Sequence, residues 1–512
     1  MSKVNGDAHG DVHDGAHDHA HGGANGDQAQ LNSAADTSSG KLSSQVVAVL
    51  ATLVSAATVM ILNETSLSVA LPAIMRDFGI NAASAQWLIT VFMLTMAVVI
   101  PTTGFLIQRF TTRQIFFSSM GLFIVGTIMG AVAPAFSVLL LARIVQAAGT
   151  AMIVPLLMTV MLQLVPLERR GTVMGFIGVV IAVAPATGPT VGGIILEAFS
   201  WHAIFLCMLP LLGAVALLGA KLLSNVGEEI RQPIDAISVL LSVVAFGGIV
   251  YSLSSLETAV ASGNNVGLLI AMLIVAVIAL VVFVLRQLRL GKKKKALLDL
   301  RPFTIRNFSL AVLIALLSFS MLIGTVTMLP IFVQNGLGEG ARTAGLIVLP
   351  GGVLQAVMSP IIGRIYDSIG PKPIMIPGAI LMATGSWLFS MLSVDAQIWQ
   401  LVAYHMIFAF GFGLLMTPMM TTALSSLTGE LYSHGSAILT TLQQLAAAAG
   451  TALLMAVLTL GTDSGLSAGL GEAAATADGI RSAFFVGALM VTVIIPVTFF
   501  MQRPESVPGS HN

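Results

Sequence analysis

Residues 138–164 read VLLLARIVQAAGTAMIVPLLMTVMLQL, an apolar run that a single charged residue, Arg143, interrupts. The hydrocarbon core of a bilayer is about 30 Å thick, so a helix of about 20 apolar residues crosses it with its backbone groups bonded internally. The run therefore predicts a transmembrane helix. Fourteen such runs occur, at residues 46–70, 84–107, 115–134, 138–164, 171–195, 203–223, 234–256, 266–288, 308–333, 342–364, 373–393, 397–424, 433–460 and 482–501.

The composition excludes a large soluble enzyme. Of the 512 residues, 56% are hydrophobic and 9% are charged, whereas soluble domains carry about 25% charged residues. Lys plus Arg and Asp plus Glu both number 23, so no net positive field favours nucleic acid. The single cysteine, Cys207, excludes an intramolecular disulfide and a multi-cysteine metal centre. We therefore expect an all-α polytopic membrane protein that is not an enzyme.

The distribution of positive charge predicts the orientation. With the N-terminus in the cytoplasm, nineteen of the 23 Lys and Arg residues lie on the cytoplasmic side, three lie outside and Arg143 lies within a span. Cytoplasmic loops are enriched in Lys and Arg, so this split predicts an even number of spans with both termini cytoplasmic. The run KKKK at residues 292–295 is most simply a topology determinant beside anionic lipid.

An internal repeat divides the chain. Leu71-Pro72 closes the first span and Leu329-Pro330 nearly closes the ninth, 258 residues later, and Pro155 and Pro418 are 263 residues apart. These similar offsets predict that spans 1–6 and spans 9–14 are two copies of one six-helix unit, with two inserted linker helices between them. The expected parts are a His- and Asp-rich tail (1–45), an N-terminal bundle (46–225), an insert with a basic loop (226–300), a C-terminal bundle (301–502) and a C-terminal tail (503–512).

Two six-helix halves around a midplane cavity are typical of secondary transporters of the major facilitator type. The chain has no G-x-x-x-x-G-K-[ST] sequence and no soluble stretch large enough for a nucleotide-binding domain. We therefore expect a secondary transporter that is not driven by ATP and that has no cofactor.

Two stretches within the spans carry a more specific resemblance. Residues 184–193 read APATGPTVGG and residues 62–72 read LNETSLSVALP. With these stretches, residues 46–501 resemble the fourteen-span drug:proton antiporter branch of the major facilitator superfamily. In that branch an acid stands where this chain has Asn63, and here Glu64 follows it. The residues matched in the fifth-span motif G-P-x-x-G-G are Gly188, Pro189, Gly192 and Gly193.

The fifth-span motif has a physical interpretation. Glycines permit close helix approach, and proline removes a backbone hydrogen bond and permits a kink. Helices that move against one another need both properties. Ordinary close packing in a membrane bundle is the alternative.

Residues 104–113, GFLIQRFTTR, resemble the superfamily's G-x-L-x-D-R-x-G-R-R motif, with Gln108 in place of the acid. The resemblance implies that this loop, and its second copy after the tenth span, hold the two halves together in the outward-facing state. Because Gln108 is uncharged, we expect the weaker latch in the first copy. The residues assigned to the two loops are Gly104, Arg109 and Arg113, and Gly363, Asp367, Gly370 and Lys372.

Glu64 is the only carboxylate well inside a predicted span. A charge there costs about 2.5–3.5 kcal/mol or more, so such a residue is a functional candidate by default. Arg143 is the only base well inside a span, and both residues lie within about 12 Å of the outer ends of their spans at 1.5 Å per residue. We expect this pair to couple proton binding to conformation. A static structural pair, or a carboxylate held by another partner, is the alternative.

Other polar side chains within the spans are candidates for lining the cavity. His405 follows Arg143 by 262 residues, at the equivalent place in the repeat, although a histidine satisfied by packing is the simpler interpretation. The 26 methionines suit adaptable walls, but they also serve as core or lipid-facing filler. The remaining candidates are Asn63, Trp87, Gln146, Gln355, Gln443 and Gln444.

The N-terminal tail carries five histidines among Asp and Gly, a composition that predicts disorder. Imidazoles with carboxylates suit zinc, copper or nickel, but a solvated tail without a role is the simpler interpretation, and we expect no metal site. The histidines are His9, His13, His17, His19 and His21.

The expected function is proton-coupled export of amphipathic small molecules across a bacterial plasma membrane, by a monomer in contact with lipid. An exporter dedicated to one endogenous metabolite, such as a siderophore or an antibiotic, is the first alternative. A metal-ion transporter is the second, although the spans hold no His and Asp cluster to support it. A non-transporting receptor on the same fold is the third, and the glycine motif argues against it.

Overall fold

The computed structural model describes residues 42–80, 82–226, 235–262, 266–293 and 295–504, and all regular structure in these ranges is helical. Twelve of the helices are long and apolar enough to cross a membrane. Every one of the fourteen predicted spans has a helix in its place, but α6 and α13 fall outside the set of twelve. The total of fourteen spans therefore stays a prediction. The five tail histidines lie outside the described residues.

The helices follow the predicted order. The N-terminal half comprises α2 (Ser44–Phe78), α3 (Ala82–Arg109), α4 (Thr112–Ala131), α5 (Phe136–Leu164), α6 (Arg170–Ala198) and α7 (His202–Leu222). The insert comprises α8 (Ala236–Ser242), the π-turn η2 (Val243–Gly247), α9 (Gly248–Ser262) and α10 (Val266–Gly291). The C-terminal half comprises α11 (Arg306–Ile331) with the π-turn η4 (Phe332–Gly336), α12 (Ala341–Ile369), α13 (Lys372–Phe389), α14 (Ile398–Ser425), α15 (Tyr432–Ser467), α16 (Glu472–Thr492) and α17 (Ile494–Thr498). Short 3-10 turns, η1 (Leu167–Arg169), η3 (Arg301–Thr304) and η5 (Gly429–Leu431), precede α6, α11 and α15.

Local sequence signals set several helix ends. The Val46 N–H donates to Ser43 Oγ at the start of α2 over 3.2 Å, and Thr111 and Gln114 form a reciprocal capping box at the start of α4. Gly370 ends α12 with a φ of 81°, a conformation that favours glycine. Several helices, α2, α15 and α16 among them, run well past the apolar runs that predicted them. Hydropathy marks only the apolar part of a helix, whereas the hydrogen-bonded backbone continues beyond it.

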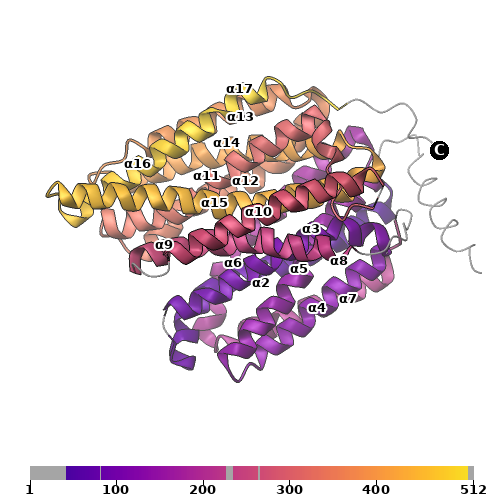
Figure 1. Ribbon diagram of the computed structural model, residues 1–512, viewed down its shortest axis with the longest axis horizontal. Coiled ribbons are helices and arrows are strands. Elements are labelled where there is room, and N and C mark those ends of the chain that lie inside the picture. The colour runs from indigo at the N-terminus through magenta and orange to yellow at the C-terminus, as the bar shows by residue number, and fades with distance from the viewer. Residues whose placement is uncertain (1–41, 81, 227–234, 263–265, 294, 505–512) are drawn as a thin grey trace, which may run out of the picture.

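The two halves repeat the same helix pairings. In the N-terminal half α2 packs on α6, α3 on α5, and α4 on both α5 and α7. In the C-terminal half α11 packs on α15, α12 on α14, and α13 on both α14 and α16. These are the pairings that two copies of one six-helix unit produce. Figure 1 shows the N-terminal half, in indigo to magenta, below the C-terminal half, in orange to yellow.

Two seams join the halves. In the first, α6 packs on α12, and in the second, α3 packs on α15. The insert lies over the second seam, because η2 and α9 contact α3 while α9 also contacts α15. In Figure 1, α8, α9 and α10 accordingly run in front of both halves. We call these the α6–α12 seam and the α3–α15 seam.

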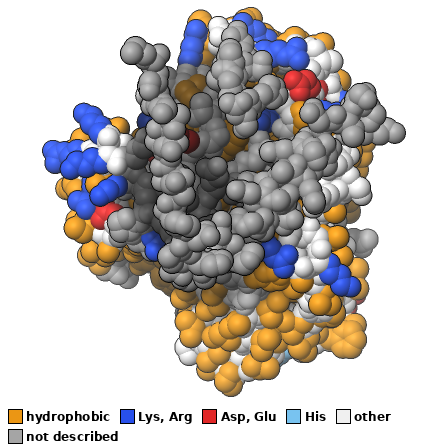
Figure 2. Space-filling view, turned by 90° about the vertical axis from the view of Figure 1, so that its right-hand side faces the viewer, with side chains coloured by type: hydrophobic (Ala, Val, Ile, Leu, Met, Phe, Trp, Pro, Cys, Tyr) orange, Lys and Arg blue, Asp and Glu red, His pale blue; other side chains and the backbone are white. Residues whose placement is uncertain are grey.

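Positive charge collects at one end of the bundle, where α3, α7, α10 and α12 finish. Figure 2 views this end and shows Lys and Arg side chains spread over it. We call it the basic end. We call the loop after α3 and the loop after α12, which were expected to hold the halves together, the two latch loops. The basic end carries residues of both latch loops and of the ends of α7 and α10, namely Arg109, Arg113, Lys221, Arg289, Arg364 and Lys372.

Candidate functional site

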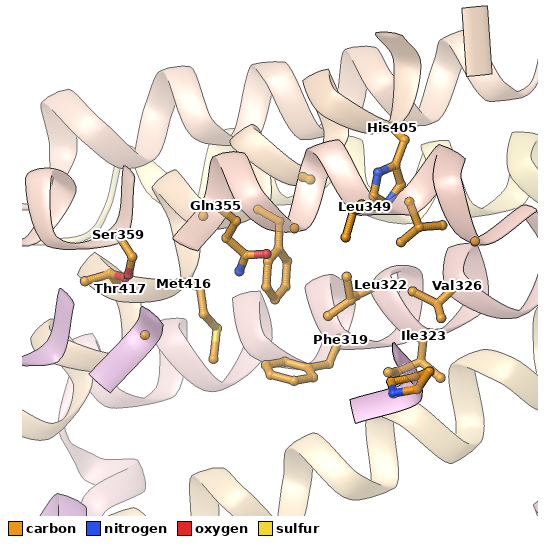
Figure 3. A pocket seen from close by; sticks show the side chains of 18 of the residues that line it. Phe319, Leu322, Ile323, Val326, Leu349, Gln355, Ser359, His405, Met416 and Thr417 are labelled. Atoms are coloured by element: carbon orange, nitrogen blue, oxygen red, sulfur yellow. The ribbon is translucent and has the colours of Figure 1, made fainter. Parts of the chain in front are cut away.

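A pocket of about 790 Å³ lies between the halves (Figure 3). Most of its wall comes from α11, α12 and α14, and the rest comes from α5, α6 and η4. The wall is mainly Leu, Ile, Val, Met and Phe, which suits an amphipathic ligand. The N-terminal half contributes Met158, Met174, Ile177, Gly178, Pro189 and Thr190. The polar side chains contributed by the C-terminal half are Gln334, Gln355, Ser359, His405 and Thr417.

The pocket is closed toward the basic end and extends toward the other. Met174 and Met420 lie near the basic ends of α6 and α14, whereas Pro330 and Gln334 lie at the opposite end of α11 and in η4. Beyond the methionines, the halves touch directly at the two latch loops.

Asp367 forms the stronger of these contacts. Its carboxylate accepts hydrogen bonds from the backbone N–H groups of Gly171 and Thr172, at 2.8 and 2.7 Å, and from the Thr172 hydroxyl at 2.5 Å. These donors form the N-terminus of α6, where the helix dipole favours a negative charge. The α6 and α12 backbones meet closely here, since a side chain at Gly363 would overlap the Gly171 carbonyl. The second-copy loop therefore joins the halves across the α6–α12 seam.

The first-copy loop joins the halves through weaker, uncharged contacts. Gln108 Nε2 donates to the Glu430 carbonyl over 2.8 Å, and Gly104 lies against the His434 side chain, whose Nδ1 is 2.9 Å from where a Cβ would stand. In the adjoining loop, Arg170 Nη2 donates to the Tyr432 hydroxyl over 3.1 Å. Because Gln108 carries an amide and no carboxylate, it cannot make a charged contact like that of Asp367.

The remaining latch-loop residues shape the helix ends. The Arg113 guanidinium donates to the Leu223 and Ala220 carbonyls, at 2.8 and 3.2 Å, and so caps the C-terminus of α7. Arg109 lies over the Phe110 ring at 5.9 Å. Lys372 is exposed at the start of α13.

The glycine motif on α6 faces α2. A Cβ at Gly188 would overlap Thr65 Oγ1, and one at Gly192 would lie 2.6 Å from the Ser66 carbonyl. Ser66 Oγ also donates to the Gly188 carbonyl over 2.8 Å. Gly193 differs, because its Cβ position meets no atom within 4 Å. Two of the three motif glycines are thus required for the α2–α6 approach, while Pro189 lines the pocket.

Arg143 is the centre of a buried polar network in the N-terminal half. It is 1% exposed, its Nη1 donates to Gln146 Oε1 over 3.0 Å, and its guanidinium carbon lies 4.1 Å from the centre of the Phe92 ring. Gln146 Nε2 in turn donates to Asn63 Oδ1 over 3.2 Å and to Thr127 Oγ1 over 3.0 Å. The network ties α5 to α2, α3 and α4.

Glu64 is half-buried next to this network. Its neighbour Asn63 bonds to Gln146, but none of the ion pairs within 4.0 Å found in the described ranges joins Glu64 to Arg143. Arg143 bonds to Gln146 instead. The two side chains are therefore not in direct contact in this conformation. Their role in proton coupling stays a prediction.

Of the predicted cavity residues, Gln355 and His405 line the pocket. Asn63 and Gln146 belong to the Arg143 network instead. Trp87 packs on Tyr251 of the insert, with ring centres 5.7 Å apart. Gln443 and Gln444 lie on α15 and are not among the lining residues.

Sequence reasoning missed Ser359 and Thr417. Their hydroxyl oxygens lie 3.3 Å apart across α12 and α14, at one end of the view in Figure 3. Gly178 of α6 approaches this pair closely, because its Cβ position would overlap Ser359 Oγ. Both are polar residues inside predicted spans and each precedes a proline, which is the signal that would have found them.

In the part of the chain that the structure describes, no group of three or more His, Cys, Asp or Glu side chains is arranged to hold a metal ion. The tail histidines are not part of that search, because they lie outside the described ranges.

Comparisons with known proteins agree on one family. The sequence profile described as Major Facilitator Superfamily matches residues 53–451. The chain is 40% identical to the uncharacterized MFS-type transporter YcnB of Bacillus subtilis over 88% of this chain and 94% of that protein. It is 36% identical to the lincomycin resistance protein LmrB of Listeria monocytogenes, over 90% and 97%.

A further relative and a solved structure complete the comparison. The chain is 32% identical to the multidrug export protein EmrB of Haemophilus influenzae, over 77% of this chain and 76% of that protein. Its fold is similar to that of the proton:xylose symporter XylE, with a TM-score of 0.62, 14% identity, and coverage of 90% and 96%.

Proposed function

Because the chain belongs to the major facilitator superfamily and is a multi-pass membrane transporter rather than an enzyme, we propose that it exports amphipathic small molecules in exchange for protons by alternating access. The observation that carries this proposal is the pocket between the two halves. Both halves line it, its wall is mainly apolar, and beyond its basic end the halves are joined by direct hydrogen bonds. A pocket with these properties suits a ligand that is taken up from one side and released on the other.

The sidedness follows from charge. Cytoplasmic loops are enriched in Lys and Arg, so the basic end faces the cytoplasm and both termini lie there. The pocket is then closed toward the cytoplasm and extends outward, which corresponds to an outward-facing state of a fourteen-span carrier. The Asp367 latch supports this assignment, because it must break for the opposite state to form.

Proton coupling rests on Glu64. It is the carboxylate deepest in a predicted span. A charge in this position costs free energy, so such a residue is a functional candidate by default. The buried Arg143 cation lies close enough to interact with it. A movement of α5 relative to α2 would change that interaction, and the affinity of Glu64 for a proton would change with it.

Transport in proteoliposomes tests the proposal. An imposed proton gradient should drive uptake of a fluorescent amphipathic dye into inverted vesicles that contain the wild-type chain. Glu64→Gln should abolish this gradient-driven uptake but retain dye exchange at equilibrium. Glu197→Gln, which changes an exposed acid at the end of α6, is the matched control and should behave like wild type. Full gradient-driven uptake by Glu64→Gln would refute the assignment of the proton site.

The substrate range draws support from the relatives. One is named for lincomycin resistance and another for multidrug export, so antibiotics and other drug-like molecules are the substrates to test first. An exporter dedicated to one metabolite would instead transport a single member of a chemically varied panel.

A further inference from the structure

Resting on the proposed export function, we propose that the pocket selects uncharged amphipathic molecules that present a hydrogen-bonding oxygen to Gln355 and His405, and that it discriminates against permanent cations. Charge, unpaired polar groups and the separation of the pocket from Glu64 lead to this inference.

The pocket wall carries no fixed charge. None of its lining residues in the described ranges is Asp, Glu, Lys or Arg. A permanent cation that enters such a pocket loses its hydration and gains no counter-charge, which is costly in an apolar surrounding. Aromatic faces offset only part of this cost. The two lining phenylalanines, Phe319 and Phe412, already pack edge to face with ring centres 5.7 Å apart.

Two polar side chains in the wall are free to bind a ligand. His405 is 4% exposed, and its Nδ1 has no hydrogen-bond partner. Gln355 takes part in none of the hydrogen bonds found among the described residues, and it projects from α12 into the same pocket. Figure 3 shows the two at separate places along the wall, away from the Ser359–Thr417 pair. A neutral imidazole offers one donor and one acceptor, and an amide offers both, so an uncharged oxygen of a ligand satisfies them.

The repeat makes the contrast between the halves explicit. Arg143 occupies the place in the N-terminal half that His405 occupies in the C-terminal half, 262 residues later. The arginine is satisfied by Gln146 and Phe92, whereas the histidine leaves a buried nitrogen unpaired. The charged copy thus holds the N-terminal half together, and the neutral copy faces the ligand.

The acid assigned to proton coupling lies apart from the pocket. Glu64 is on α2, a helix that contributes no lining residue. A substrate therefore meets no carboxylate, and exchange of an uncharged molecule for a proton moves one net charge per proton. Export should then respond to the membrane potential as well as to the pH gradient.

Binding of two similar probes to the purified full chain tests the inference. Tetraphenylphosphonium is a permanent cation, and triphenylphosphine oxide is an uncharged molecule of similar shape with one strong acceptor oxygen. We expect the oxide to bind at least tenfold more tightly than the cation. His405→Ala should weaken oxide binding about tenfold, because the ligand then loses a polar partner. Equal or tighter binding of the cation, or no binding of the oxide, would overturn the inference.

A change of selectivity is the sharper test. Gln355→Glu replaces an amide by a carboxylate of the same shape and should raise the affinity for the cation at least tenfold. Gln444→Glu places a carboxylate on α15 outside the pocket lining and is the control, which should leave both affinities unchanged. If Gln355→Glu does not fold, Leu349→Glu serves instead, since Leu349 lines the pocket and is 42% exposed. An unchanged preference in the folded pocket variant would refute the inference.

Transport distinguishes this inference from the function on which it rests. If a proton gradient drives neither probe nor the dye, the proposed export function fails. If the gradient drives the cation as fast as the oxide, export stands and the proposed selectivity fails. If a potassium diffusion potential imposed with valinomycin does not change the rate for the oxide, the oxide is not exchanged for a proton with net movement of charge, and that part of the inference fails.

Discussion

Replacing Asp367 by Asn should open the basic end. The carboxylate accepts three hydrogen bonds from the first residues of α6. A hydrogen bond to a charged group contributes about 1.5–3 kcal/mol, against about 0.5–1.5 kcal/mol for a neutral pair, and a negative charge at a helix N-terminus adds about 0.3–1 kcal/mol. Asparagine keeps one acceptor and turns an amide toward a donor. The closed state should therefore lose about 2–3 kcal/mol, which shifts the ratio of closed to open molecules by roughly 30- to 150-fold.

Distance measurements between spin labels detect this shift. Cys207, which is exposed, is first replaced by Ser, and Cys is then introduced at Lys221 on α7 and Lys372 on α13, both exposed at the basic end. In lipid nanodiscs the wild-type latch should give one short distance, and Asp367→Asn should add a longer one. Asp395→Asn changes an exposed acid in the loop before α14 and should leave the distribution unchanged. A distribution for Asp367→Asn that matches wild type would refute the latch.

Three further outcomes are expected. Gly188→Ala should lower efflux at least tenfold because its Cβ has no room against α2, whereas Gly193→Ala, with open space, should retain it at equal expression. Arg143→Ala should impair dye efflux more than Arg143→Lys, since lysine keeps the charge but not the planar contacts; equal losses would contradict this. Hydrogen bonds and the charge of Arg286 lower the pKa of Asp235 to about 2, so this stabilisation is present above the unfolded-state pKa near 4 and is lost only toward pH 2. The thermal-stability deficit of Asp235→Asn should therefore be equal at pH 5 and pH 8, and a deficit confined to pH 8 would contradict the ion pair.

The architecture was largely predictable because it depends on local composition. Apolar runs mark helices, and the repeated Leu-Pro pairs mark two related halves. The helix pairings of the two halves then follow from the repeat. Helix lengths were less predictable, since α2 and α15 continue past their apolar parts.

The site was predictable only in part, because depth along a helix does not specify rotation about it. Glu64 and Arg143 were predicted to form a pair, but Arg143 turns toward Gln146, and no ion pair within 4.0 Å joins it to Glu64 in the described ranges. A polar residue inside a span either faces a cavity or satisfies another polar residue. Asn63 bonds to another polar residue, whereas His405 faces the cavity. The position of a residue in the sequence does not distinguish these two cases.

The partner of the second latch loop could not be predicted from the sequence, because it is brought close only by the tertiary structure. Asp367 and the α6 N-terminus are 195 residues apart or more, and no spacing in the sequence relates them. The resemblance of the loop to the family motif identified Asp367, whereas only the three-dimensional structure identifies α6 as the helix that it caps.

The unequal seams determine how the basic end parts. Across the α6–α12 seam a carboxylate grips a helix end at closely spaced glycines, whereas the α3–α15 seam has an uncharged amide at the corresponding place. In the export cycle proposed above, we expect the weaker seam to separate first, so that the gap between the halves widens on that side and the pivot lies along α6 and α12. The insert bridges the wide side of that gap, because α9 contacts both α3 and α15. In that cycle α9 must therefore shift against α3, against α15 or against both.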